Sequence, residues 1–267
     1  MTTSLQRECV FIILAGILLS FILVSCSSNG ANDQGEIFIE VVDAPANYQQ
    51  INIVVDRISI HQTGAVGWTF INTSPVKFDL LTLINGHSAQ LVLSKVPAGT
   101  YDEIKIIYGT CTVTTEGIEH LLNLDASIQN GHSILGSFQI VDGQQFQLMF
   151  DYDAYNSVSV SGVFFNNYYF KPKIRVQNTS LSGWITGNVR DSSNVVSAKI
   201  TTYTGLDSVT TYNETTFGSF QLSGLPERTY TVIVIPDNPL FINDTISGIV
   251  VTRQQPTNLG AIQLKYK

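Results

Sequence analysis

The sequence predicts an all-β protein with two antiparallel β-sandwiches in tandem, of the immunoglobulin-like or prealbumin-like kind. Composition supports this class, because 44% of the 267 residues are hydrophobic and only 13% are charged, about half the usual charged fraction. The chain is also rich in aromatic β-formers, with 11 Tyr and 14 Phe. Apolar and polar residues alternate along most of the chain, which is the periodicity of half-buried strands.

The N-terminal segment predicts a lipoprotein signal peptide. Its apolar run from Val10 to Val24 is short for a membrane span of about 20 residues, but long enough for the hydrophobic region of a signal peptide. The run ends in Leu23-Val24-Ser25-Cys26, which resembles a bacterial lipobox. We therefore expect Cys26 to be acylated and to become the new N-terminus. The alternative is an uncleaved anchor helix in which this cysteine is incidental.

Four segments are expected along the chain. Residues 1–25 form the signal peptide, 26–35 a lipid-anchored polar tether, 36–177 the first β-sandwich and 181–267 the second. The polar stretch QNTSLSG separates the two sandwiches. Because the second set of alternating strands is complete, we expect it to fold by itself.

The strands follow in order from their alternation. EIFIEVV, from Glu36, places its apolar residues on one face. In QINIVVDRISIH the apolar phase shifts at Asp56-Arg57, which predicts a β-bulge. DLLTLI, residues 79–84, is the one place where a short helix is expected. The later runs of the first sandwich are VGWTFI, YDEIKIIYG, CTVTT, SFQIV, QFQLMFDY, VSVSGVFF and YYFKPKIRV, and those of the second are WITGNVRD, VSAKITTY, SVTTY, GSFQLSG, TYTVIVI, GIVVT and AIQLKY.

Two short repeats predict local structure. NGHS occurs at Asn85 and at Asn130, and in both places Asn-Gly between apolar runs favours a tight turn. VPAGTYDEIKI (Val96 to Ile106) and LPERTYTVIVI (Leu225 to Ile235) share apolar-Pro, then Thr-Tyr, then alternating isoleucine. We expect each Tyr phenol to bond nearby backbone while its ring covers one end of a sandwich.

The order of several motifs resembles a known family. DAPANYQQINIVVDRISIH (Asp43 to His61), Trp68, FDLLTLING, VPAGTY, FDYDAYNSVSV and YYFKPKIRV resemble bacterial envelope lipoproteins that carry the domain of unknown function four-three-eight-two. The resemblance covers most of residues 36–177. It implies a secreted β-sandwich with no established activity, so no active-site residue is carried over.

The second half resembles a different module, the carboxypeptidase-regulatory or transthyretin-like domain. The resemblance rests on GNV from Gly187, VSAKI from Val196, GSFQLSGLP from Gly218, and TYTVIVI. Glu227-Arg228 replaces the usual Pro-Gly before the tyrosine, so that turn is expected to differ. Such modules are usually non-catalytic and share a carbohydrate-binding-like fold with starch-binding domains. This shared fold supports carbohydrate binding only by analogy.

Charge and cysteine content limit the partners. The net charge is -7 and the basic residues are scattered, so nucleic acid is not expected as a partner. Membrane attachment then depends on lipid at Cys26. Ser27, directly after this cysteine, is the residue expected of an outer-membrane lipoprotein. The sequence does not decide between the periplasmic and the outer face of that membrane. Once Cys9 leaves with the signal peptide, Cys111 has no partner for an intramolecular disulfide. We expect it to be a buried, inert thiol.

The chain shows no pattern typical of an enzyme. GxSxG, HExxH, P-loop and Rossmann glycine motifs are absent. The four histidines, His61, His87, His120 and His132, are not at metal-ligand spacing. We therefore expect no catalytic residue, no cofactor and no metal site.

Asp151 and Asp153 in FDYDAYNS are the remaining candidates for chemistry. Strand alternation places both on the polar face that also carries Gln145, Gln147 and Met149. The two acids are then about 7 Å apart, which is too far for a shared proton. An inverting glycosidase tolerates such a gap, but its acids flank a cleft. A calcium loop would need a turn glycine and a distant glutamate, although a looser site with Asn156 stays open. We expect hydrated acids of ordinary pKa, whose joint removal costs at most about 1 kcal/mol.

The expected function is a non-enzymatic envelope lipoprotein that acts as a binding or assembly module. The alternative is a carbohydrate-binding surface lipoprotein, and a more distant one is a hydrolase that uses Asp151 and Asp153. Glycan binding predicts a row of exposed Trp or Tyr, for which the run Tyr168-Tyr169-Phe170 is one candidate, with ordinary core packing as the simpler interpretation. Assembly predicts an uncovered strand edge, and a hydrolase a pocket with converging acids.

Overall fold

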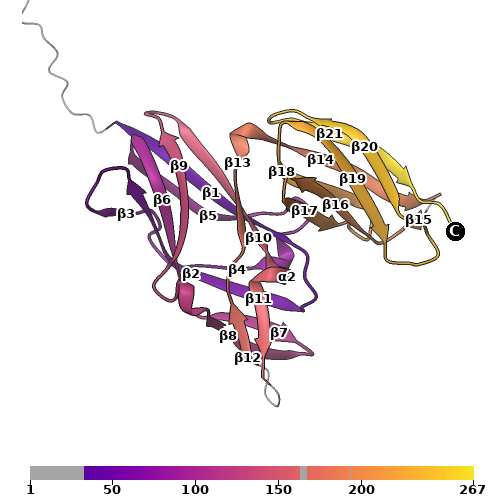
Figure 1. The fold of residues 1–267 in the computed structure, drawn as a ribbon, viewed down its shortest axis with the longest axis horizontal. Coiled ribbons are helices and arrows are strands. Elements are labelled where there is room, and N and C mark those ends of the chain that lie inside the picture. Colours follow the sequence, from indigo (N-terminus) through magenta and orange to yellow (C-terminus); the bar gives the residue numbers. More distant parts are fainter. Residues whose placement is uncertain (1–32, 163–166, 193) are drawn as a thin grey trace, which may run out of the picture. The chain divides into compact units, whose positions relative to one another are not determined.

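The computed structural model describes residues 33–162, 167–192 and 194–267, and they form an all-β fold of packed sheets, as predicted (Figure 1). In these ranges the helical segments are short: η1 (Leu80–Thr82), η2 (Ala126–Ile128), α2 (Ala154–Ser157) and η3 (Thr179–Leu181). None of the helices described is long and apolar enough to cross a bilayer. The predicted signal peptide and Cys26 lie outside the described residues.

The smaller sheet of the first sandwich has four strands in the order β13-β10-β1-β5. These are β13 (Ile174–Asn178), β10 (Gln145–Asp153), β1 (Gln34–Ala44) and β5 (Ala89–Pro97). β1 and β10 are parallel, and the other two pairs are antiparallel. The sheet begins at Gln34, two residues before the expected start at Glu36.

The larger sheet has nine strands, with the order β11-β12-β8-β7-β2-β6-β9 and with β3 and β4 also paired to β2. The strands are β2 (Gln50–Gln62), β3 (Trp68–Phe70), β4 (Val76–Asp79), β6 (Gly99–Tyr108), β7 (Cys111–Thr115), β8 (Ile118–Leu124), β9 (His132–Ile140), β11 (Val158–Ser161) and β12 (Asn167–Phe170). The register of β2 against β6 shifts between Val55 and Arg57, which confirms the predicted bulge. η1, with Asp79 as its N-cap, is the predicted short helix.

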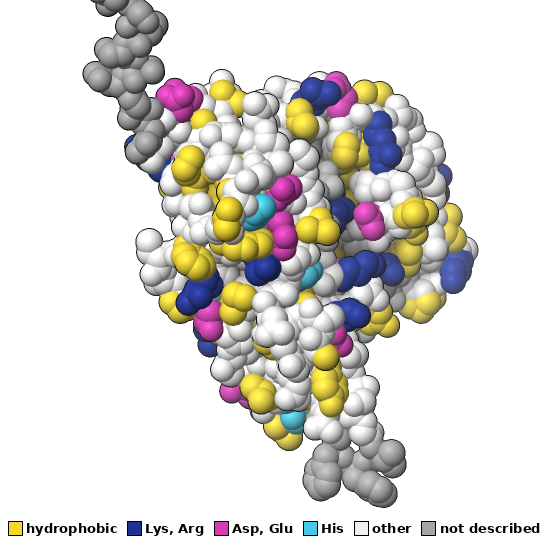
Figure 2. All heavy atoms as spheres, turned by 60° about the vertical axis from the view of Figure 1, so that its left-hand side comes forward, with side chains coloured by type: hydrophobic (Ala, Val, Ile, Leu, Met, Phe, Trp, Pro, Cys, Tyr) yellow, Lys and Arg dark blue, Asp and Glu magenta, His cyan; other side chains and the backbone are white. Residues whose placement is uncertain are grey.

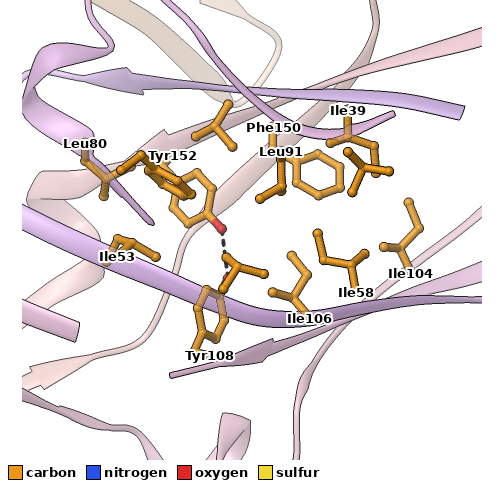
Figure 3. Close-up of a cluster of buried hydrophobic side chains, with 14 of the residues drawn as sticks. Ile39, Ile53, Ile58, Leu80, Leu91, Ile104, Ile106, Tyr108, Phe150 and Tyr152 are labelled. Atoms are coloured by element: carbon orange, nitrogen blue, oxygen red, sulfur yellow. Dashed lines mark hydrogen bonds between the residues drawn. The ribbon is translucent and has the colours of Figure 1, made fainter. Parts of the chain in front are cut away.

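The inner faces of these two sheets form the first hydrophobic core. Figure 3 shows Ile39, Leu91 and Phe150 of the smaller sheet facing Ile58, Ile104 and Ile106 of the larger one. The only polar link drawn between the layers is the hydrogen bond of 2.9 Å between the hydroxyls of Tyr108 and Tyr152. Strand alternation predicted correctly the inward residues of β1, β2, β6 and β10, whereas β5 and β8, which contribute Leu91 and Leu122, were not among the expected strands.

The second sandwich has its own core between two four-stranded sheets. One sheet contains β14 (Ser182–Asp191), β15 (Asn194–Val195), β18 (Ser219–Pro226) and β21 (Pro256–Gln263), and the other contains β17 (Asp207–Tyr212), β16 (Ala198–Thr204), β19 (Arg228–Pro236) and β20 (Asp244–Val251), in that order. Ile185, Ile200 and Val232 are fully buried between them.

The tyrosine repeat has the same structure in both sandwiches. Tyr101 Oη donates a hydrogen bond of 2.8 Å to the carbonyl of Pro97, and Tyr230 Oη donates one of 2.8 Å to the carbonyl of Pro226. Both rings are buried, at 0% and 3% exposed. A hydrogen bond of this kind contributes about 1 kcal/mol. Each tyrosine thus fixes the turn that precedes its strand, as predicted.

The first NGHS turn contacts the second sandwich directly. Asn85 has a φ of 58°, and its side chain binds two backbone groups of β18. Its Nδ2 donates to the carbonyl of Ser219 at 3.2 Å, and its Oδ1 accepts from the N–H of Gln221 at 2.6 Å. At this point the side chain of Asn85 makes the hydrogen bonds to β18 that a neighbouring strand would otherwise make. Residues 34–267 form one compact unit.

Candidate functional site

A cleft of about 400 Å³ lies where β10 and β13 of the first sandwich approach β17 of the second. Its volume is in the range of about 300–1,000 Å³ that is usual for ligand sites. Ten of the eighteen lining residues are polar or charged and three are tyrosines. FDYDAYNS contributes more of this lining than any other motif, because β10 ends and α2 begins there.

Asp151 is not a hydrated surface acid, and that expectation was wrong. Its side chain is 12% exposed and is paired with Arg175, which is 9% exposed. Arg175 Nη2 and Nε donate to Asp151 Oδ2 at 2.7 and 3.0 Å. Burial raises the pKa of Asp151 above its ordinary value, and the guanidinium beside it opposes that rise. The two residues face each other directly across β10 and β13.

Arg175 also binds the second sandwich. Its Nη1 donates to the carbonyl of Gly224 at 2.7 Å, and its Nη2 donates to that of Ser223 at 3.3 Å. Gly224 has a φ of 64°, and a Cβ there would lie 2.0 Å from Met149 Cε. Met149 itself is only 2% exposed. The middle of the face that alternation assigned to solvent is therefore covered by Ser223 and Gly224 of β18.

Asp153 organises the turn that follows β10. Its Oδ1 accepts from the N–H of Asn156 at 3.1 Å, and its Oδ2 accepts from Asn156 Nδ2 at 2.6 Å. Lys173 Nζ lies 3.5 Å from the same Oδ2. Asp153 is thus the N-cap of α2, the role in which a short polar side chain satisfies free N–H groups at a helix start.

These contacts show that the two acids have different roles. Asp151 is paired with a buried cation, and Asp153 caps a helix. Among the described residues, no group of three or more His, Cys, Asp and Glu could hold a metal ion. At FDYDAYNS the carboxylates are engaged with Arg175, Lys173 and Asn156.

The remaining walls of the cleft are polar and aromatic. Tyr155 on α2 is 63% exposed and lines it. On the opposite side, Ser208, Thr210 and Tyr212 alternate along one face of β17 and line it as well. The sequence signal for this wall was the alternation in SVTTY, but nothing in the sequence placed it opposite FDYDAYNS.

Asp43, near the cleft, is a buried acid that the sequence analysis missed. It is 5% exposed; its Oδ1 accepts from the N–H of Ala154 at 3.1 Å, while its Oδ2 has no hydrogen-bond partner in the described structure. Burial raises its pKa well above the ordinary value for an aspartate. The signal was present, because Asp43 continues the inward alternation of Ile39 and Val41. Burial therefore shifts Asp43 toward its neutral form.

The histidines make local contacts that do not form a metal site. His61 Nδ1 lies 2.7 Å from Asp102 Oδ1, and its Nε2 lies 3.0 Å from the carbonyl of Ala65. The hydrogen bond with Asp102 raises the pKa of His61. Since both ring nitrogens are engaged, neither is available to act as a base. His120 packs on Tyr168 with ring centroids 4.7 Å apart.

Cys111 and the aromatic run pack into the first core. The thiol of Cys111 is buried, and burial raises its pKa to about 11, so it is inert as expected. Tyr168 and Phe170 are 5% and 0% exposed, which supports the core-packing interpretation of this run. Elsewhere, hydrophobic and charged side chains are intermixed on the face drawn in Figure 2.

Asp151→Asn should destabilise the protein much more than Asp153→Asn. The first change leaves Arg175 as a buried charge without its anion, which costs about 3 kcal/mol. The second keeps a good N-cap residue and should cost less than about 1 kcal/mol. Urea unfolding of both variants measures the difference. Equal costs would contradict the structural role of the Asp151–Arg175 pair.

The same variants test the calcium alternative. Saturating calcium should change the melting temperature of the wild type little, because both carboxylates already have cationic partners. A rise of many degrees that disappears in Asp151→Asn or Asp153→Asn would instead assign a calcium site to FDYDAYNS.

Asp43→Asn should remove a pH dependence of stability. The pKa of Asp43 is higher in the folded protein than in the unfolded chain, where it is about 3.9. The folded state therefore gains stability from protonated Asp43 at low pH. This stability is lost as the pH rises through the pKa of the folded protein. Asparagine keeps the acceptor for Ala154 and cannot ionise. The difference in melting temperature between Asp43→Asn and the wild type should therefore shift in favour of the variant as the pH rises from about 4 to 8. The matched change Asp142→Asn, at an exposed acid, should show no such shift. A constant difference at all pH values would contradict this.

Comparison with known proteins gives a family and distant structural similarity. No curated protein matches the chain. Among solved structures, the TIE protein of Bacillus anthracis is 9% identical, with a TM-score of 0.24, and the match covers 88% of this chain and 34% of that one. The minor pilin of Streptococcus agalactiae is 10% identical, with a TM-score of 0.24, covering 86% and 96% of the two chains. A putative adhesin from Bacteroides ovatus is 9% identical, with a TM-score of 0.24, and the match covers 91% of this chain and 94% of that one.

These TM-scores are too low to define a shared arrangement of strands. This chain spans about a third of the TIE protein. The sequence match is more informative, because the family described as Domain of unknown function (DUF4382) matches residues 34–172. That range covers more than half of the chain and contains both sheets of the first sandwich except β13. The protein belongs to the family Domain of unknown function (DUF4382).

Proposed function

We propose that this protein is a non-enzymatic lipoprotein of the cell envelope that binds a ligand in the cleft between β10, β13 and β17. The observation that carries the proposal is the cleft itself, about 400 Å³ in volume and lined mainly by polar side chains and tyrosines. A cleft of this volume is large enough to hold a small ligand.

The arrangement of charges supports binding over catalysis. A general acid or base has to reach the reacting atom and has to be free to exchange its proton. Asp151 Oδ2 instead accepts two hydrogen bonds from Arg175, and both oxygens of Asp153 accept hydrogen bonds from Asn156. Both acids therefore stabilise the walls of the cleft.

The domain organisation is part of the proposal. Residues 1–25 are the signal peptide, 26–35 the tether, 36–177 the first sandwich and 181–267 the second. In support, buried residues 37–170 and 185–264 form two separate hydrophobic clusters. The resemblance of the second sandwich to a carboxypeptidase-regulatory or transthyretin-like domain rests on GSFQLSGLP and TYTVIVI, which contribute most of β18 and β19. We place the protein in the outer membrane, attached through lipid on Cys26.

Carbohydrate binding is the second candidate, and Tyr155 favours it. This ring is 63% exposed inside a polar cleft, where an aromatic face can stack on a ligand. The exposed tyrosines do not form a row, however, since Tyr203 and Tyr266 lie elsewhere in the second sandwich. An assembly role would use an uncovered strand, and among the described strands β5 pairs only with β1.

Cys26→Ser should abolish anchoring. Without acylation the lipid-dependent peptidase does not act, so an uncleaved precursor should accumulate. Immunoblots of fractionated cells, together with the mass of the N-terminal peptide, measure both effects. Cys9→Ser is the matched control and should be processed like the wild type. A variant Cys26→Ser that is cut to the mature size and stays in the membrane would refute the lipoprotein assignment.

Ser208→Trp should block the cleft. Ser208 is exposed on β17 and lines the cleft, and a strand accepts tryptophan readily. The lipidated full chain in detergent is screened by its melting temperature against soluble saccharides, short peptides and nucleotides. We expect at least one compound of these classes to raise the melting temperature. That rise should be lost in Ser208→Trp and kept in Ser159→Trp, a matched change at an exposed position of β11.

A response that Ser208→Trp retains would place the site elsewhere. If no compound of the three classes stabilises the wild type, the proposed binding function is wrong.

A further inference from the structure

The cleft carries balanced charge. Its ionic side chains are three acids and three bases: Asp151, Asp153, Asp207, Lys173, Arg175 and Lys199. Two of the acids are already paired, Asp151 with Arg175 at 2.7 Å and Asp153 with Lys173 at 3.5 Å. An ionic ligand of either sign would gain attraction from one set of charges and meet repulsion from the other. The lining therefore favours an uncharged ligand.

The wall formed by β17 is long and regularly polar. Ser208, Thr210 and Tyr212 lie two residues apart, so their side chains leave the same face of the strand. Val209 and Thr211, between them, are buried in the second sandwich. From Asp207 to Tyr212 the strand is about 17 Å long. This geometry offers a row of hydroxyl groups to an elongated ligand.

Tyr155 offers the aromatic surface on the other side. It belongs to α2, whose start is fixed by Asp153 through two hydrogen bonds to Asn156. Ala154 beside it is fully buried, and its N–H is held by Asp43. The backbone that carries the exposed ring is therefore anchored on both sides, so this backbone needs little ordering when a ligand binds.

An extended peptide fits this cleft less well. Peptides that add to a sheet use the free N–H and C=O groups of an edge strand and insert alternate side chains into pockets. β17 is an edge strand, but the cleft lies over its face, because Ser208, Thr210 and Tyr212 line it. Among the lining residues there are five aliphatic ones, of which Leu206 is fully exposed at 105%. The hydrogen-bonding groups thus come from side chains, as a polyhydroxyl ligand requires.

We infer that the cleft binds a neutral saccharide chain, with one sugar ring stacked on Tyr155 and hydroxyl groups bound along β17. The inference rests on the proposed binding function and names its ligand class. Because the lining comes from both sandwiches, the bound saccharide contacts residues of each.

The test compares sugars that differ in charge, with matched changes at Tyr155. Neutral oligosaccharides of two to four hexose or N-acetylhexosamine units are titrated into the lipidated full chain in detergent, in parallel with oligosaccharides of uronic acids and of unacetylated amino sugars. Calorimetry or saturation-transfer NMR gives the affinities. Tyr155→Phe keeps the ring and should stay within about twofold of the wild type, whereas Tyr155→Ala should weaken neutral saccharides about tenfold. Both are exposed substitutions and should leave the melting temperature nearly unchanged.

Three results would overturn the inference. The first is a preference for charged sugars over neutral ones, and the second is equal binding of neutral sugars by Tyr155→Ala and the wild type. The third is a ligand of another class, such as a peptide, whose stabilisation is lost in Ser208→Trp; the proposed binding function would then stand while the saccharide assignment fails. If nothing binds the cleft, both fail together.

Discussion

The buried guanidinium of Arg175 is the contact on which the cleft depends. It is bound to Asp151 within the first sandwich and to the carbonyls of Gly224 and Ser223 in the second. A cation that is 9% exposed is costly unless its anion and its hydrogen-bond acceptors are all in place. Arg175 meets this condition only when Ser223 and Gly224 of β18 lie against β10. The charge therefore specifies how β18 lies on β10, beside the cleft that Arg175 lines.

Hydrophobic burial stabilises each sandwich, whereas polar contacts join the two sandwiches. The two apolar clusters provide most of the driving force for folding, and each lies between the sheets of one sandwich. The contacts between the sandwiches are mainly polar, as in the pairing of the Asn85 side chain with Ser219 and Gln221 on β18. Polar contacts require defined geometry, whereas apolar ones tolerate sliding. Such a junction suits a binding site whose walls come from both halves.

FDYDAYNS illustrates how one short motif serves several purposes. Phe150 and Tyr152 fill the first core, Asp151 neutralises Arg175, and Asp153 starts the helical turn that presents Tyr155. Two carboxylates at this spacing resemble a catalytic pair in the sequence. In the structure each of these carboxylates takes part in a hydrogen bond or ion pair with a neighbouring side chain.

The sequence by itself determined the all-β class, the inward residues of the strands that alternate clearly, the bulge at Asp56-Arg57 and the paired roles of Tyr101 and Tyr230. These are local properties, since alternation and turn chemistry act over a few residues. It also contained a signal for Asp43, which lies in phase with buried isoleucines. Only the tertiary structure decided that the polar face of β10 is covered and that its end lies opposite β17. Alternation assigns a residue to a face, but it carries no information about what packs on that face. Arg175 and Gly224 lie 24 and 73 residues beyond Asp151 in the sequence, and only the packing of the sandwiches brings them together.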